Sequence, residues 1–260
     1  MRVRAVASHP FPSSRREKAP AQSGGDQSLL TSAATGRWSF LAATFVGLFL
    51  LGLVPAHAAL RTWSGAGANA LWTTVSNWTG LIAPTNGDSV TFPAFALRRT
   101  NTYNLDVSNL TQVTISGDYL LNDTGARTLP LTSGLFHSAN AVSNSVLMPV
   151  SINADQTIQV TTANATLFVE AIRLNSNDLV LNGAGHIFLG PITNGTGTVS
   201  KLGLGTWITS SSNNFKGPTR VLAGTNILRG ADFTNSASFT VSNATLRGVG
   251  RLPQDRKSVV

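Results

Sequence analysis

The chain has 260 residues and no cysteine, and its 19 Lys and Arg outnumber its 11 Asp and Glu. The net charge of +8 falls to +4 when residues 1–58 are set aside, and the basic residues that remain are scattered along the sequence. This pattern excludes the basic stripe of a nucleic-acid-binding protein, and the absence of cysteine excludes a small domain held by disulfides.

Residues 1–58 have the layout of a secretory signal peptide. Phe40 to Val54 form an uncharged, mostly apolar run of 15 residues, which is short for a membrane-spanning helix of about 20 residues. Basic residues precede the run, and Ala56-His57-Ala58 follows it as a small-x-small cleavage site. We predict an extended signal peptide, with an uncleaved anchor or a misassigned start codon as alternatives. The mature chain would begin at Ala59 and be exported to the outer membrane, the cell surface or the extracellular space.

Residues 59–93 are rich in tryptophan. Trp63, Trp72 and Trp78 lie within sixteen residues, beside glycines. An open end of a β-helix exposes strand edges and core, so we predict that these residues form a hydrophobic cap over the N-terminal end. The alternative is that their rings stack on sugars, as in a carbohydrate-binding module.

From Thr91 onward, short segments of alternating apolar and polar residues are separated by Gly, Asn, Asp, Ser and Thr. This alternation predicts half-buried strands, for example around Val113, Ile158 and Val241. Only Leu167 to Leu174 is ambiguous, and its β-branched and aromatic residues favour a strand.

The turn residues recur with a period. Gly183, Gly203, Gly224 and Gly248 each close a strand-like run, at spacings of 20, 21 and 24 residues. A unit of this length cannot bury its own apolar face, so the period predicts a stacked solenoid. We predict an all-β fold, a right-handed parallel β-helix, rather than a β-sandwich. Its coils would fill residues 94–196 and continue through 197–254.

The segment from Gly197 to Gly230 carries a series of residues at characteristic spacings: Lys201, Gly203, Gly205, Thr206, Asn214, Gly217, Thr219, Val221, Ala223, Gly224 and Thr225. This series resembles the autotransporter-associated β-strand repeat, also called the passenger-associated transport repeat. Phe215 stands where that repeat has Tyr, and Pro218 and Arg220 replace small polar residues. Ser238 to Gly250 is similar to the next coil of such proteins. The Trp-rich start looks like their opening segment, through Trp63-Ser-Gly65, Trp72, Asn77-Trp78, Pro84 and Asp88-Ser-Val-Thr-Phe92.

The resemblance implies a β-helical passenger of a bacterial surface protein. In its coils, the glycines supply turns or close backbone approaches, Val221 and Leu228 face the interior, and Asn214 caps a bend with its side-chain amide. The implied function is structural or adhesive. The implied partner is an extracellular glycan or another cell-surface ligand. Contact with a membrane is expected only through the signal peptide or a region beyond the C-terminus.

The titratable residues do not form a recognisable catalytic or metal-binding motif. His137 and His186 stand alone in the mature chain, with no HExxH and no GxSxG. Asp155 and Asp178 are 23 residues apart, about one coil, so a β-helix would bring together two carboxylates such as a glycosidase needs. We interpret them instead as turn-capping residues. We predict no cofactor, no metal and no catalysis in this fragment. The alternative is a polysaccharide-active or carbohydrate-binding β-helix whose active residues lie beyond Gln254.

Asp255 to Val260 (DRKSVV) does not continue the preceding pattern. The nucleotide string GATCGGAAGAGCGTCGTGTAG encodes this hexapeptide and a stop codon, and it resembles a common sequencing adapter. We therefore expect a non-native tail and a protein that continues beyond Gln254. Resequencing of the locus tests this, and a genomic stop codon directly after Val260 would contradict it.

Overall fold

The computed structural model describes residues 58–138 and 143–254. The predicted signal peptide, apart from Ala58, and the predicted tail at residues 255–260 lie outside the described residues. The described residues all belong to one compact unit. Its regular elements are β-strands and a single 3-10 turn, η2 (Val75–Asn77). In this part of the chain no helix has the length and apolar character needed to cross a bilayer.

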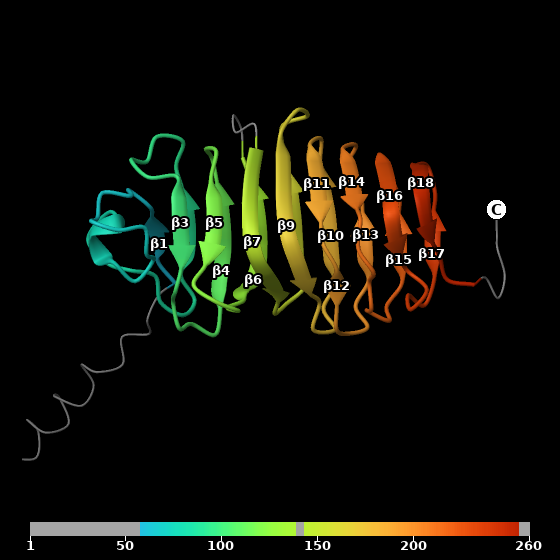
Figure 1. Ribbon diagram of the computed structural model, residues 1–260, viewed down its shortest axis with the longest axis horizontal. Helices are drawn as coiled ribbons and strands as arrows, with labels where there is room; N and C mark the ends of the chain where they lie inside the picture. Colours follow the sequence, from blue (N-terminus) through green and yellow to red (C-terminus); the bar gives the residue numbers. More distant parts are fainter. Residues whose placement is uncertain (1–57, 139–142, 255–260) are drawn as a thin grey trace, which may run out of the picture. The chain divides into compact units, whose positions relative to one another are not determined.

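Parallel pairing between successive coils arranges the strands in three rows, which are stacked into a β-solenoid of about 8 turns (Figure 1). Row 1 contains β1 (Leu60–Thr62), β2 (Ser89–Phe92), β4 (Leu110–Ile115), the end of β6 (Leu129–His137), β8 (Gln156–Val160), β10 (Leu179–Gly183), β13 (Val199–Lys201), β15 (Thr219–Val221) and β17 (Phe239–Val241).

Row 2 follows row 1 in each coil. It contains β3 (Thr100–Tyr103), β5 (Leu120–Asp123), the start of β7 (Ser143–Ile152), the start of β9 (Thr166–Arg173), β11 (His186–Leu189), β14 (Thr206–Thr209), the start of β16 (Thr225–Asp232) and the start of β18 (Thr245–Arg251). Row 3 is made by β12 (Ile192–Thr193), the start of β6 and the ends of β7, β9, β16 and β18. The all-β solenoid predicted from the sequence is confirmed.

The coil length agrees with the predicted period. In row 1, Leu181, Lys201 and Val221 are paired in succession at intervals of 20 residues. Earlier coils are slightly longer, since Leu135 pairs with Ile158 across 23 residues. The ambiguous segment at residues 167–174 lies mostly in β9, so its assignment as a strand is confirmed.

The four periodic glycines do not occupy equivalent positions, contrary to our expectation. Gly203 and Gly183 are stacked in successive coils, at the turn that follows the row 1 strand. A Cβ on Gly203 would be 2.2 Å from the Gly183 carbonyl oxygen. Gly224 lies instead on Gly205, and Gly248 is within β18 in row 2. Three turns per coil all favour small residues, so sequence spacing alone does not tell which turn a glycine belongs to.

Alternate residues of each row face inward and form one continuous apolar core. Val113 and Ile115 in β4 and Ile158 and Val160 in β8 are fully or almost fully buried, as the period-two pattern predicts. Val241 in β17 is exposed, because no further described coil covers it. The core is therefore filled by the inward residues of many short strands rather than by any single element.

Candidate functional site

The N-terminal end of the solenoid is filled by an aromatic cluster. Ring centroids are 5.1 Å apart for Trp63 and Trp78 and 5.6 Å apart for Trp72 and Trp78, both in edge-to-face geometry. Phe92 and Tyr103 continue the cluster at 5.2 and 5.1 Å from Trp72. All three indoles are at most 1% exposed. Such pairs add to the free energy gained by burying the rings, and the cluster supports the predicted cap.

The polar edges of the indoles are also satisfied inside the protein. Trp63 Nε1 donates to the Arg98 carbonyl oxygen at 2.7 Å, Trp72 Nε1 to Asn101 Oδ1 at 2.6 Å, and Trp78 Nε1 to the Trp72 carbonyl oxygen at 2.7 Å. With rings and N–H groups enclosed, none of the three indoles offers a face to a sugar. This geometry corrects the sugar-stacking alternative for these residues.

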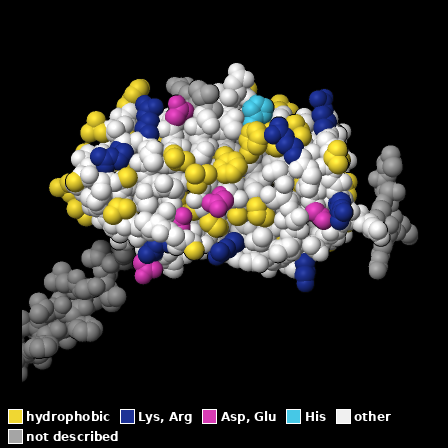
Figure 2. All heavy atoms as spheres, viewed as in Figure 1, with side chains coloured by type: hydrophobic (Ala, Val, Ile, Leu, Met, Phe, Trp, Pro, Cys, Tyr) yellow, Lys and Arg dark blue, Asp and Glu magenta, His cyan; other side chains and the backbone are white. Residues whose placement is uncertain are grey.

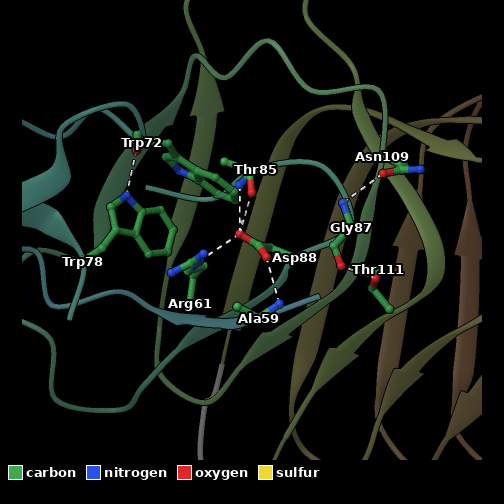
Figure 3. A network of polar contacts seen from close by, with 9 residues as sticks. All are labelled: Ala59, Arg61, Trp72, Trp78, Thr85, Gly87, Asp88, Asn109 and Thr111. Atoms are coloured by element: carbon green, nitrogen blue, oxygen red, sulfur yellow. Dashed lines mark hydrogen bonds and ion pairs between the residues drawn. The ribbon is translucent and has the colours of Figure 1, made fainter. Parts of the chain in front are cut away.

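A buried carboxylate joins the start of the described chain to the first coils. Asp88, 2% exposed, accepts hydrogen bonds from Ala59 N and Arg61 Nε, both at 2.8 Å, and from Thr85 N at 2.9 Å (Figure 3). Burial acts to raise the pKa of Asp88, but the hydrogen bonds outweigh it and hold the pKa below its ordinary value. An Asp before a strand is common in any β-protein, so this network could not be predicted from the position of Asp88 in the sequence.

The repeat residue Lys201 lies in the core. It is paired between Leu181 and Val221 in row 1 and is 1% exposed. Its ammonium group donates to the carbonyl oxygen of Gly203 and lies 3.4 Å from that of Ala223, so it links the turns of two successive coils. Desolvation by burial lowers the pKa of Lys201 to about 8. Among the described residues, no ion pair involves Lys201.

Replacement of Lys201 by Met is expected to stabilise the solenoid by about 1–2 kcal/mol at pH 7. A folded-state pKa of about 8 against an ordinary 10.5 corresponds to a penalty of about 3 kcal/mol while the lysine is charged, and the loss of two hydrogen bonds offsets part of the gain. The folded pKa is the lower one, so wild-type stability should rise as pH increases from 8 toward 10.5, and the variant should lack this rise.

Urea unfolding between pH 8 and about 9.5 measures the Lys201 effect. Higher pH is avoided, because burial raises the pKa of Tyr103 and of Tyr119 to about 12 in the fold, so ionisation of these tyrosines in the unfolded chain lowers stability above pH 10. Equal pH dependence in wild type and variant would contradict the assignment of the titrating group.

The other repeat residues lie where the coils touch. A Cβ on Gly205 would be 1.9 Å from the Gly185 carbonyl oxygen, and one on Gly217 would be 1.9 Å from that of Gly197, so the expected close approaches are present. Gly224 has a φ of +71°, as a tight turn allows. Of the remaining repeat residues, Thr206 is the first residue of β14, and the Ala223 carbonyl oxygen accepts a hydrogen bond from Lys201. The apolar residues Phe215, Val221 and Leu228 are buried.

Asn214 caps a bend, as expected, since its Oδ1 accepts a hydrogen bond from Asn194 N at 3.2 Å. Its neighbour Asn213 makes the more deeply buried contacts. Asn213 Oδ1 accepts from Ile192 N at 2.9 Å, and its Nδ2 donates to the Asp232 carbonyl oxygen at 3.2 Å. Asn213 therefore bridges the coil before it and the coil after it. Phe215, two residues after Asn213, is buried, and residues two apart in extended backbone face the same side. This alternation is the only sequence signal that Asn213 faces inward.

The carboxylates of Asp155 and Asp178 accept hydrogen bonds from backbone N–H groups. Asp155 Oδ1 accepts from Asp178 N at 2.8 Å, and Asp178 Oδ1 accepts from Thr198 N at 2.7 Å, one coil further on. The turn-capping interpretation of Asp155 and Asp178 is thus confirmed. His137 is buried in row 1, where desolvation lowers its pKa, and His186 faces outward in row 2. The described residues hold no group of three or more His, Cys, Asp or Glu able to bind a metal.

The outer face of row 2 carries a candidate binding surface that the sequence did not reveal. Phe168, Phe188, Ile208 and Ile227 are in register in β9, β11, β14 and β16, and we call them the apolar column. Phe188 and Ile227 are half-buried and Ile208 is only 6% exposed, so the two phenylalanines are the members that a ligand could reach most easily. Hydrophobic side chains gather over this part of the molecule, next to a histidine and to basic groups (Figure 2). Phe168 is 37% exposed, and the Arg229 guanidinium lies 5.8 Å from the centroid of the Phe188 ring.

Hydroxyl groups border the apolar column. Its neighbouring column, two residues earlier in each strand, contains Thr166, His186, Thr206, Thr225 and Thr245. Strands of a sheet are about 4.8 Å apart, so polar and apolar groups repeat side by side along the face. A separate hollow of about 440 Å³ lies at the corner between rows 3 and 1 and is lined by Asn194, Gly195, Thr196, Asn214, Lys216 and Asn235.

Comparison with protein-family models, with curated proteins and with solved structures finds no match to this chain.

Proposed function

We propose that the chain is part of an exported, non-catalytic β-solenoid that serves as a structural and adhesive segment of a bacterial surface protein. The autotransporter-associated repeat that residues 197–230 resemble is consistent with this function. The regular stack of coils, with an aromatic cluster at its N-terminal end, suits a rigid stalk. The use of Asp155 and Asp178 as backbone caps supports a role without catalysis for these residues.

The observation that carries adhesion is the apolar column on the outer face of row 2. A ligand that fits it needs apolar ring faces and polar groups in alternation, because Phe168 lies beside Thr166 and Phe188 lies beside His186, with Thr206 in the next strand. Pyranose rings have this character, so a cell-surface polysaccharide lying along the stack is the proposed ligand. Aromatic side chains supply the largest contact area for such a surface.

We expect the double variant Phe168→Ser, Phe188→Ser to bind polysaccharide at least about tenfold more weakly, a loss of ~1.4 kcal/mol. The measurement is retention on a panel of immobilised neutral and acidic polysaccharides. Phe136→Ser is the matched control, because Phe136 is a half-buried residue that faces outward in row 1. Equal loss in the control, or full binding by the double variant, would exclude the apolar column as the adhesive surface.

An alternative function is that of a polysaccharide-active enzyme whose catalytic residues lie beyond Gln254. The same panel distinguishes this alternative when it is repeated with a longer chain from the resequenced locus. Release of reducing ends or unsaturated sugars favours the enzyme, and retention without release favours the adhesive segment.

A further inference from the structure

The backbone of Ala59 is held at two points where the described chain enters row 1. Ala59 N donates to Asp88 Oδ1 at 2.8 Å (Figure 3). The Ala59 carbonyl oxygen accepts from Ser89 N at 2.8 Å. Ala58, immediately before it, is exposed. The Ala58–Ala59 peptide bond therefore joins an exposed residue to a residue whose backbone nitrogen is hydrogen-bonded to the buried Asp88 carboxylate.

The two oxygens of Asp88 have different partners. Oδ2 accepts from the Arg61 side chain at 2.8 Å and from both the backbone and the hydroxyl of Thr85 at 2.9 and 3.1 Å. Oδ1 accepts from Ala59 N. A cationic nitrogen is a stronger donor to a carboxylate than a neutral amide is. The Oδ1 side of Asp88 is therefore already placed for a positive charge at the position of the Ala59 nitrogen.

We propose that hydrolysis of the Ala58–Ala59 peptide bond creates an α-ammonium group on Ala59 that pairs with Asp88, so that removal of the leader strengthens the N-terminal cap. Water adds across the bond, Ala58 becomes the C-terminal carboxylate of the leader, and the nitrogen remains on Ala59 and takes up a proton. The inference rests on the proposed export, which brings the chain to a peptidase that accepts small residues at Ala56 and Ala58.

Among the described residues, Asp88 and Arg61 form the ion pair at this point, Asp88 favouring an ammonium group on Ala59 and the Arg61 guanidinium opposing it. The two cations use different oxygens of Asp88, since Ala59 N binds Oδ1 and Arg61 Nε binds Oδ2. The neighbouring loop is held by neutral groups, since Gly87 N donates to Asn109 Oδ1 at 3.0 Å and Thr111 Oγ1 donates to the Gly87 carbonyl oxygen at 2.5 Å. Asp88 is buried and its pKa is lowered by its hydrogen bonds, so it is ionised at neutral pH. A nearby carboxylate favours the protonated amine. The pair should stabilise the fold at neutral pH and lose this effect as the pH rises through the raised pKa of the amine.

The first test is the N-terminal residue of the chain recovered after expression in a bacterial host, determined by mass spectrometry. Ala59 as the first residue supports the proposal, and any other first residue overturns it. Polysaccharide binding plays no part in this measurement or in the next, so loss of the adhesive function would leave both results unchanged. A mature Ala59 with an ordinary amine would overturn the ion pair while leaving export intact.

The second test is an NMR titration of the α-amino group in the mature chain. We expect a midpoint at least about one pH unit above the ordinary 7.7–8.0, and a return to the ordinary value in Asp88→Asn. Asp106→Asn, which changes an exposed carboxylate, should leave the raised midpoint in place. If Asp88→Asn does not fold, a chain with Gly-Ser added before Ala59 keeps Asp88 but moves the amine away, and its amine should titrate normally. An ordinary midpoint in the unmodified mature chain overturns the pair.

Discussion

Replacement of Trp72 by Ala is expected to lower the free energy of unfolding by about 3–5 kcal/mol. Trp72 is fully buried and contacts Trp78, Phe92 and Tyr103 at centroid distances of 5.6, 5.2 and 5.1 Å. Its removal leaves a cavity at the centre of the cap and deprives Asn101 of the indole donor that lies 2.6 Å away. Urea unfolding followed by tryptophan fluorescence and by circular dichroism measures the change.

Phe95→Ala is the control for the Trp72 variant. Phe95 lies in the loop after β2 and is 92% exposed, so its loss should change stability by no more than about 0.5 kcal/mol. Sedimentation of both variants tests whether the cap also prevents association, since uncovered strand edges pair with other chains. A stable, monomeric Trp72 variant would contradict the role of the cluster as a cap.

The second large effect is expected for Gly183→Ala, at about 2–4 kcal/mol of lost stability. Gly183 ends β10 with a φ of +102°, and a Cβ there would be 2.0 Å from the Val160 carbonyl oxygen of the preceding coil. The side chain thus meets backbone that cannot move without disturbing the β8–β10 ladder. Strain at positive φ contributes about 1 kcal/mol, and overpacking contributes about 1–3 kcal/mol.

Gly230→Ala separates these two contributions. Gly230 also has a positive φ, +74°, but a Cβ there meets no atom within 4 Å. Only the backbone strain should remain, so the loss should be about 1 kcal/mol. Similar losses for the two variants in thermal unfolding would show that contact between coils does not decide the choice of glycine at residue 183.

The solenoid could be predicted from the sequence because its coils repeat at nearly constant length. The alternation in β4 and β8 and the spacing of Gly183 and Gly203 both follow from stacked parallel strands. Gly224 lies at a different turn from Gly203, because glycine serves several turns of a coil, and Gly248 lies inside β18 rather than at the end of a strand-like run. A count along the chain gives the period of the coil but not the position within it.

The candidate sites were less predictable, because their properties depend on which face of a strand each residue occupies. Lys201 is two residues after the apolar Val199, so the alternation of a strand indicates that its side chain faces inward. The tendency of lysine to be exposed opposes that interpretation. Phe168 lies in a run with Leu167 and Val169, so the sequence does not show which of the three faces outward. The ion pair of Arg61 and Asp88 joins residues 27 positions apart. Asp88 belongs to the opening segment that the Trp-rich start resembles, but that resemblance assigns Asp88 no partner.

The stacking of the coils also bears on the order in which the chain folds. Successive strands of row 1 in the C-terminal half pair residues 20 positions apart, so each new ladder closes a short loop of similar length. Loop-closure entropy increases with the logarithm of loop length, and pairing between residues close in sequence speeds folding. A chain that emerges N-terminus first can complete its aromatic end early. Each later turn can then pair with an edge that is already formed, so we expect the coils to form in order from the N-terminal end.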